Sequence, residues 1–143
     1  MKSEKHKFKN DYSKFVEISN LLGHKYRELG RYSDATNEHL DSIQACEKIK
    51  NKIISLQLRA VSYRALGECY SEMSMHVEAL MEHNRFLSLT LEMNDLIEIQ
   101  RAHATIGRTY LLWALDTDNK RTQRSILNKS ISSFQKALEL CEK

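Results

Sequence analysis

The sequence predicts an all-α fold built from repeated helical hairpins, and three observations favour it. The 143 residues include no proline and only 4 glycines, so helix-breaking residues are rare. A content of 41% hydrophobic and 29% charged residues suits helices that each bury one face and expose the other. The third observation is an internal repeat. A chain of this length has room for one domain with a modest core.

The repeat is anchored by three glycines, Gly23, Gly67 and Gly107, which are spaced 44 and 40 residues apart. Each follows a leucine or an isoleucine and precedes a tyrosine by three residues. The first two are followed at fixed distances by an alanine and then a histidine: Ala35 and His39, then Ala79 and His83. Because a glycine costs a helix about 1 kcal/mol, another helix must approach closely there. We expect the alanine to face the glycine and both histidines to be packing residues.

The repeat and its turn residues predict six helices. The expected ranges are 13–29, 32–49, 53–73, 76–92, 96–115 and 122–142. In the third unit, the position equivalent to the alanine is Ser130, 23 residues after the glycine instead of 12. We expect this insertion to form a loop over about 116–121 that leads into a long last helix. The repeat domain is predicted to span 13–143, after a basic N-terminal segment of residues 1–12.

Charge and hydropathy restrict the class of protein. The formal net charge is only +3, and basic residues gather near the N-terminus at Lys2, Lys5, Lys7, Lys9 and Lys14. This cluster fits a solvated terminus better than a nucleic-acid-binding arm, which would need more charge and interleaved aromatic residues. There is no apolar run of membrane-spanning length and no signal-peptide pattern. The sequence therefore predicts a soluble intracellular protein without membrane or direct nucleic-acid binding.

Residues that usually carry catalysis or hold metals do not form a recognisable pattern. The sequence has no glycine-rich phosphate loop, nucleophile elbow or metal triad. Cys46, Cys69 and Cys141 are too far apart for a zinc site or a disulfide framework, so reduced thiols are expected. Asp116 and Asp118 lack the glycine and the terminal glutamate of a calcium loop, which favours a polar turn. We predict no enzyme activity, no cofactor and no metal.

The spacing Leu-Gly-x-x-Tyr…Ala resembles the tetratricopeptide repeat, and it recurs in register over nearly the whole chain. This resemblance implies a tetratricopeptide-repeat α-solenoid of about three helical hairpins, the third with an insertion. Such repeats usually have 34 residues, so the longer spacing here is similar to the Pins/LGN type of adaptor. Those adaptors also place a histidine where His39 and His83 stand.

A more specific resemblance lies in the third unit. The run EIQRAHATIGRTYLL, from Glu98 to Leu112, is followed by the 11-residue insertion and then by ISSFQKALEL. This arrangement is similar to the N-terminal repeats of the Tonsoku-like protein family, over roughly residues 15–143. His103 departs from the pattern, because many repeats carry a large aromatic or aliphatic residue there.

The Tonsoku-like resemblance implies a non-catalytic scaffold of the nucleus, with the cytoplasm as second choice. Members of this family act in replication-fork repair and homologous recombination. The implied partners are a histone tail and other replication-fork repair proteins. The alternative is a Pins/LGN-type adaptor in cell polarity or signalling.

A ligand is expected on the concave face lined by the first helix of each repeat. The predicted peptide-binding residues are Glu17, Asn20, His24, Arg64, Glu68, Glu72, Arg101 and Arg108. Arg64, Glu68 and Glu72 share one helical face. Two interpretations stay open for this stripe: a solvated ion pair, or a mixed-charge lining for a charged extended peptide. No asparagine directly follows a repeat glycine, which argues against a clamp for a peptide's C-terminal carboxylate.

Overall fold

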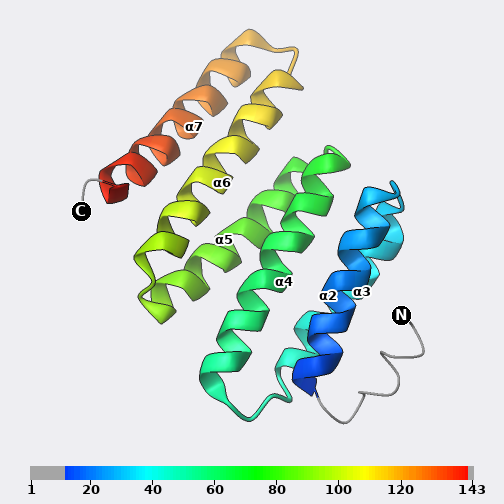
Figure 1. The fold of residues 1–143 in the computed structure, drawn as a ribbon. Helices are drawn as coiled ribbons and strands as arrows, with labels where there is room; N and C mark the ends of the chain where they lie inside the picture. The colour runs from blue at the N-terminus through cyan, green and yellow to red at the C-terminus, as the bar shows by residue number, and fades with distance from the viewer. Residues whose placement is uncertain (1–11, 142–143) are drawn as a thin grey trace. The chain divides into compact units, whose positions relative to one another are not determined.

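A computed structural model describes residues 12–141, and all of its regular elements are helices (Figure 1). The helices are α2 (Tyr12–Glu28), α3 (Tyr32–Cys46), α4 (Lys52–Glu72), α5 (His76–Met93), α6 (Leu96–Leu115) and α7 (Lys120–Cys141). The all-α helical-repeat prediction is confirmed, and every helix boundary lies within three residues of its predicted place. The predicted N-terminal segment 1–12 falls outside the described residues except for its last position. No helix within 12–141 is long and apolar enough to cross a membrane.

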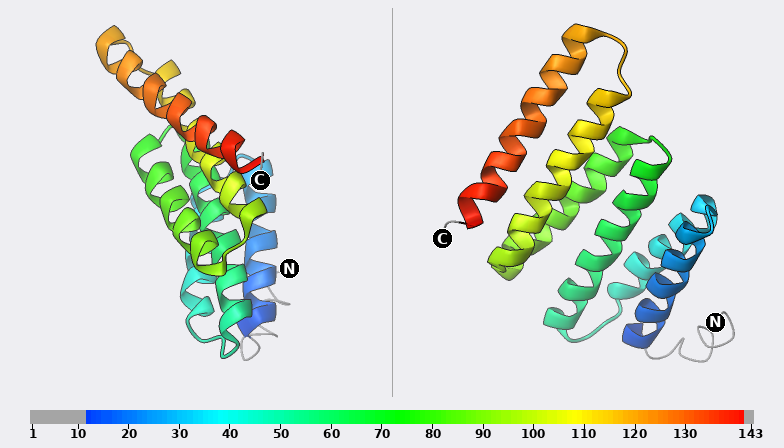
Figure 2. Two further views of the ribbon diagram at one scale, coloured as in Figure 1. Left: turned by 90° about the vertical axis from the view of Figure 1, so that its left-hand side faces the viewer. Right: turned by 45° about the horizontal axis from the view of Figure 1, so that its top comes forward.

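The chain divides into two compact units, residues 1–69 and 70–143. The first contains α2, α3 and most of α4, and the second contains the end of α4 with α5, α6 and α7. Within the first unit α2 packs along α3, and within the second α5 packs on α6 and α6 on α7. Figure 2 shows α6 and α7 side by side as an antiparallel hairpin in both of its views.

Residues with left-handed backbone conformations end three of the helices. Gly30, with a φ of 76°, lies in the turn between α2 and α3, where the amide of Arg31 donates to the carbonyl of Tyr26 at 2.8 Å. Asn94 adopts a φ of 54° as the C-cap of α5, and Ser74 a φ of 59° after α4. Glycine and asparagine tolerate this conformation better than other residues, which explains the sharp chain reversals.

Two small apolar clusters form the core of the first unit. Leu22 and Tyr26 of α2 pack with Ala35 of α3 and Cys69 of α4. The second cluster joins Val16 of α2 to Ala45 and Cys46 of α3, with Leu58 of α4 against it. Burying each large apolar side chain contributes about 1.5–3 kcal/mol. These contacts fix the three helices of this unit against one another.

Two of the three repeat glycines, Gly23 and Gly107, face aromatic rings, and this corrects the prediction that they face the alanine. A Cβ added to Gly23 would lie 2.6 Å from Nε2 of His39, and one added to Gly107 would lie 3.1 Å from the ring of Phe134. Ala35 instead packs in the first core cluster. The close approach inferred from the glycine is therefore present at both positions, but it makes room for a flat ring on the next helix.

The insertion in the third repeat lengthens the hairpin, as predicted. Helix α6 ends at Leu115 and α7 begins at Lys120, so the connecting loop is short. The side-chain oxygen of Asn119 accepts hydrogen bonds from the amides of Arg121 and Thr122, at 3.0 and 3.1 Å. Asparagine is a strong N-cap residue because it satisfies amides that lack a partner in the first turn. The polar-turn interpretation of this loop is confirmed.

Candidate peptide-binding surface

The predicted binding residues belong to the first helices of the three repeats, but they divide between the two units. Glu17, Asn20 and His24 of α2 lie in the first unit together with Arg64 and Glu68 of α4. The second unit holds the remaining three, Glu72, Arg101 and Arg108. The predicted set is therefore split between the two units.

Asn20 differs most from its predicted role, because its amide bonds within the fold. Its Oδ1 accepts from Nδ1 of His39 on α3 at 2.9 Å, and its Nδ2 donates to the hydroxyl of Ser62 on α4 at 3.0 Å. The Ser62 hydroxyl donates in turn to the carbonyl of Leu58 at 3.0 Å. Asn20 therefore holds three helices together, and binding a peptide would require it to give up these bonds.

His39 is the buried centre of that polar network. Only 1% of the residue is exposed, and its ring lies against Gly23. Burial, together with the positive charge of Arg27, lowers the pKa of His39 to about 4. The ring is therefore neutral at physiological pH and carries its proton on Nδ1, which is hydrogen-bonded to Asn20. The predicted packing role of His39 is confirmed, and His83 is equally buried at 1% exposure.

A charged network covers the end of α2 and reaches α4. Nη2 of Arg27 donates to Nδ1 of His24 at 3.2 Å, and Nε2 of His24 donates to Glu28 at 2.9 Å. Nη1 of Arg27 lies 3.5 Å from Oε2 of Glu68 on α4. The Arg27 and Glu68 side chains are each about three-quarters buried. The carboxylate of Glu68 is thus already balanced by a cation from the neighbouring helix.

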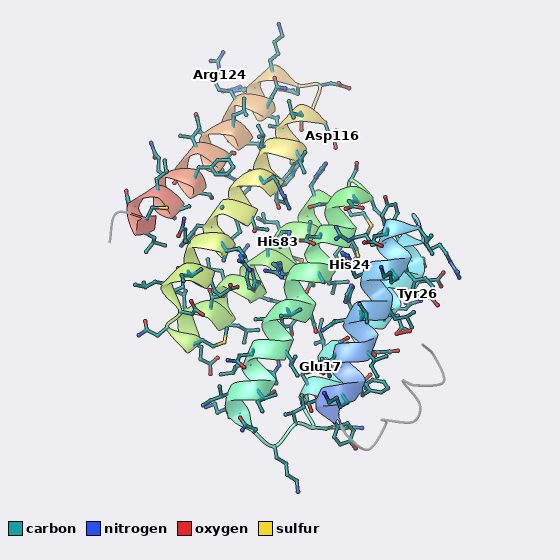
Figure 3. The ribbon with its side chains drawn as sticks, in the orientation of Figure 1. Glu17, His24, Tyr26, His83, Asp116 and Arg124 are labelled. Atoms are coloured by element: carbon teal, nitrogen blue, oxygen red, sulfur yellow. The ribbon has the colours of Figure 1, made fainter. Side chains whose placement is uncertain are left out.

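Glu17 and His24, which both project from α2, are more accessible (Figure 3). Glu17 is 3.5 Å from the exposed Nζ of Lys14, an arrangement that contributes little stability in water. His24 is about half-exposed. On α4, Arg64 is half-buried and Val61 exposes 41% of its surface. The first unit therefore presents carboxylate, imidazole and apolar groups along its first helices.

In the second unit, the first-helix residues are mostly exposed. Arg101 lies 3.1 Å from Glu98, one turn earlier on α6. Arg108 is exposed and forms no ion pair within residues 12–141. Leu112, 39% exposed, follows on the same helix, and Glu72 is exposed at the end of α4. This surface could accept an acidic or carbonyl-rich ligand at Arg108, with an apolar contact at Leu112.

One cluster in the second unit was not predicted from the sequence. The rings of His76 and Trp113 are stacked, with centroids 6.1 Å apart and planes 9° apart, and Tyr110 stacks on Trp113 at 6.4 Å. Nε2 of His76 lies 2.6 Å from the carboxylate of Asp116. The cluster joins the start of α5 to the end of α6. In the sequence, the available indication of this cluster was the single tryptophan, Trp113, three residues before Asp116 at the end of the helix.

No group of three or more His, Cys, Asp or Glu side chains within residues 12–141 could hold a metal ion. Cys46 and Cys69 are buried, and Cys141 is exposed. Burial raises the pKa of the Cys46 thiol to about 11, so it is a poor nucleophile at neutral pH.

Comparison with known proteins supports the resemblance seen in the sequence. The chain is 31% identical over 121 residues to a Tonsoku-like protein of Mus musculus, which covers 85% of the chain and 8% of the mouse protein. It is 29% identical over 127 residues to the Bos taurus protein, covering 89% of the chain and 9% of that protein. The Drosophila melanogaster protein is 27% identical over 124 residues, or 87% of the chain and 8% of its own length. No model of a known protein family matches the chain.

The three matches agree with one another and with the helical-repeat fold. The chain spans less than a tenth of the length of these relatives. On this evidence, the chain belongs to the Tonsoku-like protein family.

Proposed function

We propose that this chain is a non-catalytic protein-interaction scaffold of the nucleus that binds a histone tail, or a tail-like segment of a partner, during replication-fork repair by homologous recombination. The observation that carries the proposal is the charged surface on α2 and α4 of a Tonsoku-like helical repeat. It combines the exposed carboxylates of Glu17 and Glu28 with a third at Glu68.

This surface suits a lysine-rich, extended peptide. The distance between Glu17 and Glu28 along α2 is about 16 Å, at 1.5 Å per residue, which is roughly the length of five extended residues. Lysine side chains of a peptide could therefore reach both carboxylates, while its backbone lies against Val61. Charge-assisted hydrogen bonds to such carboxylates contribute about 1.5–3 kcal/mol when water is partly excluded.

The ion pair between Arg27 and Glu68 refines the expected role of Glu68. Arg27 competes with a peptide lysine for this carboxylate, because the two side chains are only 3.5 Å apart. A lysine-rich ligand must therefore displace Arg27 or share Glu68 with it. Removing the arginine should make the surface more acidic and should strengthen binding of a basic peptide.

The test is calorimetry of the chain against a synthetic lysine-rich histone-tail peptide. Replacing Glu17 and Glu28 together by Gln should weaken binding by about tenfold, equivalent to about 1.4 kcal/mol, and should reduce its salt dependence. Arg27→Gln should strengthen binding. Glu78→Gln is the matched control, because Glu78 is exposed on the second helix of its repeat and should have almost no effect.

The same peptides discriminate the proposed function from the adaptor alternative. Binding of polarity-protein peptides, with no binding of histone tails, would favour a Pins/LGN-type adaptor. Equal loss of binding from the Glu78 control and from the Glu17 and Glu28 pair would place the ligand elsewhere on the chain.

A further inference from the structure

The first helices of the repeats can be aligned residue by residue, because each contains one repeat glycine. Counted from Gly23 in α2 and from Gly107 in α6, four equivalent positions share one side of the helix. In α2 these positions hold Glu17, Leu21, His24 and Glu28. In α6 they hold Arg101, Thr105, Arg108 and Leu112. The two helices thus present equivalent faces that can be compared directly.

The face of α2 stays open although two helices follow α2 in its own unit. All four of its positions are exposed. Helix α4 contacts α2 through other residues, since Asn20 donates to Ser62 at 3.0 Å and Arg27 lies 3.5 Å from Glu68. The α6 residues equivalent to these two contacts of α2 are Ala104 and Leu111. The repeat register therefore leaves the four-residue face of α6 accessible whatever follows α7.

The charge on this face is reversed between the two helices. Glu17 and Glu28 make the α2 face acidic, whereas the α6 face has Arg101 and Arg108 and no acidic residue. The Arg101 side chain is 50% exposed, and Arg108 is exposed as well. Because an acidic face attracts cations and a cationic face attracts anions, the two faces favour ligands of opposite charge.

Both arginines of α6 can accept a ligand carboxylate. Arg108 forms no ion pair within residues 12–141, and its planar guanidinium matches the two oxygens of a carboxylate. Arg101 lies 3.1 Å from Glu98, one turn earlier on α6. Such a pair on a helix surface contributes little stability in water. A ligand carboxylate can therefore replace Glu98 or share Arg101 with it.

The spacing along α6 suits an extended chain. The seven residues from Arg101 to Arg108 span about 10 Å, roughly the length of three extended residues. Thr105, between the arginines, is small, and its hydroxyl already donates to the carbonyl of Arg101 at 2.8 Å. Leu112 follows one turn beyond Arg108 and is 39% exposed. The face thus offers two carboxylate-binding groups and an apolar contact at one end.

We propose that the face of α6 formed by Arg101, Thr105, Arg108 and Leu112 binds an extended acidic segment of a partner protein. Two carboxylates of the segment, about three residues apart, pair with the arginines, and an apolar side chain beyond them packs on Leu112. This site goes beyond the proposed function, because its ligand has the opposite charge to a lysine-rich tail. It uses no residue of the first unit.

A nucleic acid fits this face less well than an acidic peptide does. Proteins that bind single strands combine several phosphate contacts with aromatic rings on which the bases stack. The four positions of the α6 face supply two cations and no aromatic ring. Leu112 also offers an apolar contact that a phosphate backbone does not use.

The proposal is tested with the full chain and a labelled twelve-residue peptide, followed by fluorescence anisotropy at low salt. The peptide carries two pairs of glutamates three residues apart, a leucine two residues beyond the second pair, and serine elsewhere. It should bind, and a peptide with glutamines in place of the glutamates should bind at least about tenfold more weakly. Equal binding of the two peptides would overturn the charge selection that we propose.

Variants of α6 then locate the contact. Arg101→Gln combined with Arg108→Gln should weaken binding of the acidic peptide by at least about tenfold. Leu112→Ser should weaken it by about threefold, whereas Glu98→Gln should strengthen it by about twofold because Arg101 loses its competing partner. Circular dichroism on each variant verifies that α-helical content is unchanged. A double arginine variant that keeps its helical content and binds as before would contradict the proposal.

Two control variants each remove two positive charges outside this face. The first combines Arg124→Gln with Lys129→Gln on α7, where both residues are exposed. The second combines Lys5→Gln with Lys7→Gln near the N-terminus. Each control should change binding by less than about twofold. A loss as large as that of the arginine pair would show that the peptide responds only to net charge, and would overturn the proposal.

A twelve-nucleotide single-stranded DNA tests the other class of ligand. It should compete with the acidic peptide only weakly. DNA that binds more tightly than the peptide, and loses this binding in the double arginine variant, would reassign the face to nucleic acid. None of these outcomes depends on whether the first unit binds a lysine-rich peptide, so failure of one proposal is distinguishable from failure of the other.

Discussion

The hairpins α2–α3 and α6–α7 both pack a ring against a helical glycine, but the two rings differ in polarity. In both, a helical glycine lets the ring of a residue on the next helix approach closely: His39 over Gly23, and Phe134 over Gly107. The histidine ring needs a hydrogen-bond partner when buried, and Asn20 supplies it. The phenylalanine ring needs none. In its hairpin, Ser130 bonds to the carbonyl of Gly107 at 2.7 Å.

The comparison shows that the repeat specifies shape more strictly than polarity. A flat ring fits above the glycine in either hairpin, but each ring imposes its own requirements on the neighbouring helices. The first hairpin depends on a polar network that reaches Ser62 of α4. The third depends on apolar contact and on one bond to the backbone. The two hairpins should therefore respond differently to pH and to mutation.

The largest expected difference concerns acid. The pKa of His39 is about 4 in the fold and about 6.5 when exposed, so the unfolded chain binds this proton first. The contribution of His39 to the free energy of unfolding is constant above pH 6.5 and becomes unfavourable to folding as pH falls toward 4. The slope is about 1.4 kcal/mol per pH unit, and the total loss is about 3 kcal/mol. Urea unfolding followed by circular dichroism between pH 7 and pH 4 measures this loss.

His39→Phe gives the first hairpin the ring of the third and serves as the comparison for the acid effect. In this variant, the free energy of unfolding should lose a substantial part of its pH dependence between pH 6.5 and 4. A smaller dependence of the same sign should remain because of His103 on α6, whose pKa is lowered by burial and by Lys136. An unchanged slope in His39→Phe would show that other groups control acid unfolding.

The fold could be predicted because its signals are local, whereas the partner of the glycine could not. Glycine spacing, turn residues and apolar periodicity located the six helices to within three residues. The same spacing suggested Ala35 as the residue facing Gly23, since small residues often pair. Ala35 and His39 are four positions apart on α3, and the rotation of this helix about its axis decides which of them lies over Gly23. Sequence periodicity determines that rotation poorly. His39 was therefore assigned to packing without its specific contact.

The second prediction compares alanine at the two glycines. At Gly23 the new Cβ would lie 2.6 Å from His39, whose ring is buried and held by Asn20. Overpacking of this kind costs about 1–3 kcal/mol, partly offset by about 1 kcal/mol of helix propensity. At Gly107 the new Cβ would lie 3.1 Å from the ring of Phe134, so the cost of overpacking and the gain in helix propensity should nearly cancel. Thermal unfolding should thus show a clearly lower midpoint only for Gly23→Ala.

The opposite ranking, with Gly107→Ala more damaging, would mean that Phe134 is held more rigidly than His39. Gly30→Ala is a useful reference, because no atom lies within 4 Å of its Cβ position but its φ of 76° is unfavourable for alanine. Its loss of stability would come from backbone strain alone. It separates the steric cost at Gly23 from the general cost of replacing a glycine.

The third prediction removes the polar network that only the first hairpin has. Asn20→Ala should cost about 1–2 kcal/mol, because it leaves Nδ1 of His39 buried without its partner. Asn37→Ala is the matched control on the exposed side of α3 and should have little effect. Hydrogen exchange read by mass spectrometry should show faster exchange in α2 and α3 only for the first variant. Equal exchange in both variants would show that the network contributes nothing.

The candidate site was harder to predict than the fold, for a physical reason. Sequence register indicates which side of a helix a residue occupies, but not whether a neighbouring helix already uses its side chain. Asn20 and Glu68 were both expected on the binding face, and the structure pairs them with His39 and Arg27. Exposed residues such as Glu17 and Arg108 satisfy the same pattern and have no long-range partner among residues 12–141. Their functional role stays a prediction.

The smallest expected effect tests how charge differs between the two hairpins. In the first, Asp34 lies in the first turn of α3 and pairs with Arg31 at 2.8 Å. In the third, the first turn of α7 has no acidic residue and contains Lys120 and Arg121, which repel the positive end of the helix dipole. Arg121→Glu should therefore stabilise this hairpin by about 0.3–1 kcal/mol at low salt.

Trp113, the only tryptophan, lies on α6 and reports on the third hairpin directly. Urea unfolding followed by its fluorescence should shift to higher urea for Arg121→Glu, and the shift should shrink as salt is added. Lys129→Glu lies more than two turns from the helix end and should give a smaller shift, because the dipole acts within the first turn. Equal shifts for both variants, at low and high salt, would attribute the stabilisation to net charge. The unbalanced first turn of α7 would then have no energetic consequence of its own.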